Sequence, residues 1–164
     1  MTTITSETYP YDEHPLQAAA QTSRTDRNSS LDALHVLEAA LYEPAPAREQ
    51  SWIEAARSAL ETLREALDTQ ASGDSEEASL LSEIANEEPR LLPRIDRLRR
   101  QHQALRDSVR AALDELAAQA DDGHIDIADV RDRVAEIARR LRHHRAQESD
   151  LIYEAVNINL GTGD

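Results

Sequence analysis

The chain has 164 residues, with 18 basic and 32 acidic side chains and a formal net charge of −14. Such an acidic chain lacks the positive field that binds a phosphate backbone, so nucleic acid is excluded as an expected partner. The absence of cysteine excludes disulfides, thiolate metal ligands and cysteine nucleophiles. Because phenylalanine is absent and only four glycines occur, the composition predicts an all-α fold with a core of Leu, Ile, Val and Ala.

The first 29 residues show no pattern of regular structure. They are polar, contain Pro10 and Pro15, and have no sustained hydrophobic period, so residues 1–29 are expected to form a disordered or loosely docked arm. They also lack the basic region and apolar run of a signal peptide. No segment reaches the roughly 20 apolar residues of a membrane span. We therefore expect a cytoplasmic protein without a membrane partner, with residues 30–164 as its folded domain.

Four amphipathic helices are predicted in order after the arm. Ser29 or Ser30 can cap the first helix, Pro44 ends it, and Asp126 can cap the last. The expected helices cover approximately residues 30–43, 51–70, 90–119 and 127–155. Because short connections join them, consecutive helices pack as neighbours, which predicts an antiparallel up-down-up-down four-helix bundle.

Polar residues interrupt the buried faces of the two longest helices. Apolar residues recur every three or four positions along both, but His102 interrupts the third helix, and His144 and Glu148 interrupt the fourth. An antiparallel hairpin brings the two histidines to about the same height. We therefore expect their rings to lie less than two helix diameters apart, roughly 20 Å.

The first two helices contribute further polar candidates. Glu38 lies on the apolar stripe of the first helix with His35 on its flank, and Gln70 and Asp74 continue the stripe of the second. A lone buried carboxylate costs several kcal/mol unless a cation or a metal ion pairs with it. Three histidines and two glutamates at one level match the ligand preferences of iron, manganese or zinc. The alternatives are a hydrogen-bonded polar core without metal and, for Gln70 and Asp74, a solvated helix end.

Three stretches of the chain carry a family resemblance: "LDALHVLEAAL", "PRLLPRIDRLRRQHQAL" and "HHRAQESDLIYEAVNINLGTGD". In this order they resemble the hemerythrin-like (HHE cation-binding) domains, over about residues 30–164. The resemblance implies a four-helix bundle that holds a non-haem, usually di-iron, centre through histidines and carboxylates. It implies roles in oxygen binding, oxygen or redox sensing, iron handling or peroxide chemistry, and it places His35, His102, His144 and Glu148 at ligand-like positions.

The second helix departs from the family pattern. The histidine and the glutamate four residues later that the family carries fall at Gln70 and Asp74. Glutamine is a weak metal ligand, so a mononuclear site, an altered dinuclear site and a vestigial pocket all stay open. We predict at most one tightly bound metal ion per chain. Gln70→His, alone or together with Asp74→Glu, is expected to raise metal binding toward two ions.

Two functions fit these observations. The first is a hemerythrin-like protein that binds iron or another divalent metal, takes dioxygen or peroxide as a ligand, and has an oxygen-linked, redox or sensing role. The second is a metal-free bundle that acts as an interaction or regulatory module. The sequence assigns neither an enzymatic reaction nor a protein partner.

Overall fold

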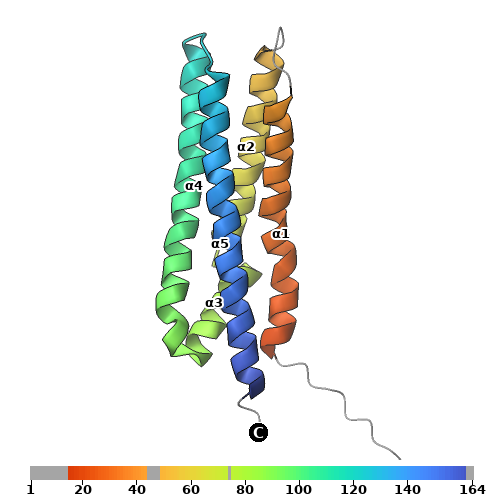
Figure 1. Ribbon diagram of the computed structural model, residues 1–164, viewed down its shortest axis with the longest axis vertical. Coiled ribbons are helices and arrows are strands. Elements are labelled where there is room, and N and C mark those ends of the chain that lie inside the picture. The colour runs from red at the N-terminus through yellow and green to blue at the C-terminus, as the bar shows by residue number, and fades with distance from the viewer. Residues whose placement is uncertain (1–14, 44–48, 74, 162–164) are drawn as a thin grey trace, which may run out of the picture.

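A computed structural model describes residues 15–43, 49–73 and 75–161, and within these ranges every regular element is a helix. The elements are α1 (Pro15–Tyr42), α2 (Glu49–Ala71), α3 (Glu76–Glu87), the 3-10 turn η1 (Pro89–Leu91), α4 (Leu92–Asp121) and α5 (Ile127–Gly161). The four long helices lie side by side as a bundle, and the short α3 lies at the end of the bundle where α5 finishes (Figure 1). The predicted all-α class is confirmed. Within the described ranges, none of the helices is long and apolar enough to cross a bilayer.

The first helix begins much earlier than expected. Residues 15–29, predicted as part of a disordered or loosely docked arm, are the first half of α1. Proline is favoured at the first position of a helix, which suits Pro15. Leu16 is fully buried and joins an apolar cluster with Leu80, Ile84 and Leu151. A single leucine leaves no hydrophobic period in the sequence, so the tertiary contact, rather than local pattern, accounts for this extension. Residues 1–14 of the expected arm lie outside the described residues.

Leu16→Ala tests whether the start of α1 is held by this contact. We expect the substitution to lower the free energy of unfolding by about 2–4 kcal/mol, because it removes a fully buried leucine side chain. Leu92→Ala is the control, since Leu92 is 42% exposed and should cost less than about 1 kcal/mol. Urea unfolding measures both. Equal and small losses in the two variants would show that the start of α1 is loosely docked, as the sequence predicted.

A polar layer divides the core of the bundle into two apolar clusters. One cluster contains the part of α4 from Leu105 to Leu116, and the other contains Leu91 of η1 together with Ile95 and Leu98 of α4. The polar layer comprises the buried polar residues between them: Ser30, Gln70, Ser75, Glu77, His102, His144, Arg145 and Glu148. All five α-helices, or the residue that caps one, contribute to it. The apolar clusters on either side fix the height of these side chains in the bundle.

The connection between α4 and α5 sets the register that brings the two histidines together. Gly123 adopts a positive φ of 71°, which glycine takes without steric cost. Asp126 then caps α5, because its Oδ1 accepts a hydrogen bond of 3.0 Å from the backbone N–H of Asp129. The predicted N-cap is confirmed. With this tight turn, His102 of α4 and His144 of α5 reach the same level.

Candidate metal centre

The two histidine rings form one side of the polar layer. Their centroids are 5.7 Å apart and the ring planes are inclined by 58°. Their separation is well below the 20 Å limit given by the sequence, so the predicted approach of His102 and His144 is confirmed. Both rings are buried.

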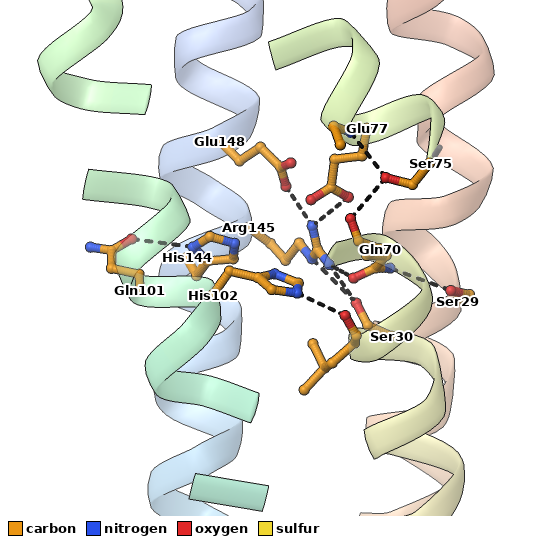
Figure 2. Close-up of polar contacts among 12 residues, drawn as sticks. Ser29, Ser30, Gln70, Ser75, Glu77, Gln101, His102, His144, Arg145 and Glu148 are labelled. Carbon is orange, nitrogen blue, oxygen red and sulfur yellow. Dashed lines mark hydrogen bonds and ion pairs between the residues drawn. The ribbon is translucent and has the colours of Figure 1, made fainter. Parts of the chain in front are cut away.

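Each ring is anchored through one nitrogen. Nε2 of His102 lies 2.8 Å from the backbone oxygen of Leu67, and Nδ1 of His144 lies 3.2 Å from Oε1 of Gln101 (Figure 2). These oxygens can only accept, so each anchoring nitrogen carries the proton. Nδ1 of His102 and Nε2 of His144 therefore keep their lone pairs. Metal-binding histidines are commonly oriented in this way, by donating the second ring N–H to an oxygen.

Both rings are held in the neutral state that metal binding requires. Burial lowers the pKa of His102, with the charge of Arg145 as a further cause. Burial, followed by the charge of Arg145, lowers the pKa of His144 to about 3. A proton on the imidazole therefore does not compete with a metal ion at neutral pH.

Glu77 supplies a carboxylate to the histidine pair. One ligand atom each from Glu77, His102 and His144 lies within 4.8 Å of the other two, and all three residues are buried. Two ligands on opposite sides of one ion are about 4.0–4.4 Å apart, so small side-chain adjustments suffice for a shared ion. Glu77 lies in the first turn of α3, where Ser75 accepts a hydrogen bond of 3.1 Å from the N–H of Ala78 as the N-cap.

Glu148 contributes a second carboxylate with an oxygen available for a cation. The residue is 1% exposed, and its Oε1 has no hydrogen-bond partner among the described residues. Burial, against the charge of Arg145 and with the help of the neighbouring Glu77, raises its pKa to about 7. A buried oxygen without a donor is costly, and a bound cation would satisfy it.

Arg145 fills the other side of the layer. Its guanidinium donates to Oε2 of Glu148 at 2.6 Å and to Oε2 of Glu77 at 3.1 Å. It also donates to Oγ of Ser30 at 3.2 and 3.0 Å and to Oε1 of Gln70. In Figure 2 the guanidinium lies between the histidine pair and the residues of α1 and α2.

A cavity of about 230 Å³ adjoins the layer. Its walls include Glu77, Leu81, Leu98, His102, His144 and Glu148. Because the histidines and both carboxylates line it, a small molecule inside the cavity would lie beside a cation held by these groups.

Comparison with protein families decides the family of the chain. The model of the hemerythrin HHE cation binding domain matches residues 29–156. The chain belongs to the hemerythrin HHE cation-binding domain family. Comparisons with curated proteins and with solved structures give no significant match. The matched hemerythrin region contains the whole polar layer, so the family assignment and the His/Glu cluster indicate cation binding in the same part of the chain.

Two of the residues expected as ligands of this hemerythrin domain lie elsewhere. His35 is exposed, and Glu38 accepts hydrogen bonds of 2.8 and 3.0 Å from Arg142 at the surface. Neither residue belongs to the group of Glu77, His102 and His144 in the polar layer. The reason is the rotation of α1, which buries Leu34 and Leu37 and turns position 38 to the flank.

The remaining expected residues divide between the site and its edge. His102, His144 and Glu148 lie together in the polar layer, as described above. Gln70 is also buried there, rather than solvated at a helix end, but its amide oxygen accepts from Arg145. Asp74 lies outside the described residues.

Sequence reasoning missed Glu77 and Arg145. Glu77 lies between two helix-breaking segments. Ser75 followed by acidic residues identifies the start of a helix, but it does not show which face of that helix packs against the bundle. Arg145 lies four residues after Leu141 and three before Glu148, so helical spacing places it near the buried face. Arginine is almost never fully buried without a partner, and the sequence alone did not show this partner.

Proposed function

We propose that this hemerythrin domain binds one divalent metal ion, iron first, between His102, His144 and Glu77, with Glu148 at its side. The observation that carries the proposal is the orientation of the histidines. Both rings are anchored through one nitrogen, and the lone pair of the other is left for a ligand bond. The residues thus fit a metal ion in burial, tautomer and charge.

The donor set favours iron. Two imidazoles and one carboxylate form the ligand combination of non-haem Fe(II) sites, which leave coordination positions open. Glu77, His102 and His144 are such a set. A bound iron ion supplies the capacity to bind oxygen species and to change its oxidation state. We infer an oxygen-linked, redox or sensing role, with dioxygen or peroxide reaching the metal from the cavity of about 230 Å³.

The chain's own residues orient and protect the site. Leu67 and Gln101 fix the rings, while Leu81 and Leu98 give the cavity an apolar part of its wall. Glu148, whose pKa is raised to about 7, can hold or release a proton at Oε1 beside the cavity. We infer that these residues provide metal binding, an adjoining cavity and a proton site at neutral pH.

The proposal includes the finer arrangement of the bundle. We infer that α1, α2, α4 and α5 run up, down, up and down, in antiparallel order. The support is the short turn between α4 and α5, together with the packing of α1 on α2, α2 on α4 and α1 on α5. We further propose that residues 30–164 hold the metal-binding site of a cytoplasmic protein, with residues 15–29 packed against them as the start of α1.

Metal analysis of purified protein tests the function. After anaerobic loading with Fe(II) and desalting, we expect about one iron per chain by mass spectrometry. His144→Ala should abolish retention while the helical circular dichroism persists, because it removes one of the two imidazole ligands. His35→Ala should retain iron as the native protein does, since His35 is exposed. Unchanged iron content in His144→Ala would show that His144 is not a ligand. If the native protein retains zinc or manganese but not iron, the metal of the site is not iron.

A metal-free interaction module is the second candidate. One observation favours it: the guanidinium of Arg145 already pairs with Glu77 and Glu148, so both buried carboxylates have a cationic partner within the protein. The same loading experiment separates the two functions. If the native protein retains none of the divalent ions tested, metal binding is contradicted and the interaction module is the function that fits.

A further inference from the structure

Arg145 is the one arginine within the polar layer as the structure describes it, and its side chain is held at every nitrogen. Nε donates to Ser30, one terminal nitrogen donates to Glu77 and Glu148, and the other to Ser30 and Gln70. The residue is 5% exposed. A guanidinium with this number of partners is fixed in place and keeps its charge.

Glu77 and Glu148 both bind the guanidinium of Arg145, and both also line the cavity beside the two histidines. Arg145 binds Oε2 of Glu148, whereas Oε1 of Glu148 is buried without a hydrogen-bond partner among the described residues. Oε2 of Glu77 also binds Arg145, and a carboxylate oxygen of Glu77 lies within 4.8 Å of ligand nitrogens of both histidines. Each carboxylate therefore bridges the histidine side and the arginine side of the layer.

Carboxylates that bridge two cations are a feature of two-metal sites. Here the second cationic position is filled by a side chain. A second divalent ion beside a buried guanidinium would meet strong charge repulsion, since a buried site screens charges weakly. The amide oxygen of Gln70, which also faces this second position, is already engaged because it accepts a hydrogen bond from Arg145.

We propose that Arg145 acts as an internal cation that occupies the second position of the site and limits it to one metal ion. The proposal rests on the proposed function, that the histidine side binds metal. It also changes the expectation for helix α2: Gln70→His alone should not add a second ion, because the guanidinium stays in place.

The test compares the metal stoichiometry of native protein, Arg145→Met and Arg145→Lys after anaerobic loading with Mn(II). Native protein and Arg145→Lys should bind one ion, because both keep a cation in the layer. Arg145→Met should bind two, because it frees Oε2 of Glu77 and of Glu148 for a hard cation that prefers oxygen ligands. Electron paramagnetic resonance gives a second readout: a six-line signal for one ion, and a coupled signal for two.

Several outcomes overturn the proposal. Two ions in native protein, or one ion in a folded Arg145→Met variant, would show that Arg145 does not set the number. If Arg145→Met fails to fold, Gln70→His decides: one ion upholds the proposal, and two ions contradict it, since Arg145 is still present. No metal in any protein would overturn the proposed function and this inference together, whereas one ion in both native protein and Arg145→Met overturns the inference alone.

Discussion

Arg145→Met should lower the free energy of unfolding of the metal-free protein by about 3–5 kcal/mol. The substitution removes the cation that pairs with Glu77 and Glu148, whose side chains are 5% and 1% exposed, and leaves both carboxylates buried without it. Methionine fills a similar volume with apolar atoms, so lost packing contributes little. Urea unfolding in the presence of a chelator measures the loss.

Arg142→Met is the matched control for this prediction. Arg142 lies on the same helix, one turn before, and also binds a glutamate, Glu38, with two hydrogen bonds. Its side chain is 48% exposed, so water solvates both partners and screens their attraction, and we expect a loss below about 1 kcal/mol. Adding Glu148→Gln to Arg145→Met should restore part of the stability, because one buried charge is removed. Equal losses in the two methionine variants would contradict the role assigned to burial.

Metal affinity should rise with pH by about 100-fold between pH 5 and pH 8, with most of the rise below pH 7. Burial raises the pKa of Glu148 to about 7, so the metal-free protein holds a proton there that a cation must displace. Each pH unit below that pKa weakens binding about tenfold, and above it the proton is already lost. His144 contributes no such dependence in this range, since its pKa is about 3.

Calorimetry in buffers of different ionisation enthalpy measures the displaced proton directly. At pH 6 we expect about 0.9 proton released from Glu148 per metal ion, and at pH 8 about 0.1. Glu148→Gln should bind more weakly but lose this proton release, because its amide does not titrate. Proton release that persists unchanged in Glu148→Gln would assign the displaced proton to another group.

Together these expectations describe a site that is stable before it binds metal. Arg145 pairs with both carboxylates, and the two histidines are neutral and anchored. The apolar clusters on either side of the polar layer fix the height of these side chains in the bundle. The metal-free protein therefore needs no large rearrangement to accept an ion. We expect binding to cost one displaced proton and small side-chain movements.

The sequence by itself determined the all-α class and the approach of His102 and His144. Both follow from local rules: a regular spacing of apolar residues every three or four positions, and a tight turn capped by Asp126 that sets the register of two long helices. Glu148 follows from the same spacing, since it lies one turn after His144 on the same face.

The tertiary structure alone decided which other side chains enter the polar layer. In α1, apolar residues occupy neighbouring stripes, so the sequence was compatible with burial of Glu38, but packing buries Leu37 instead. Successive residues of a helix point about 100° apart, so burial of Leu37 turns Glu38 away from the core. Glu38 then pairs with Arg142 at the surface. Glu77 and Arg145 enter the layer because α3 folds back against the bundle and gives a buried arginine its carboxylate partner. Burial of charge depends on partners distant in sequence, and only the packed structure brings them together.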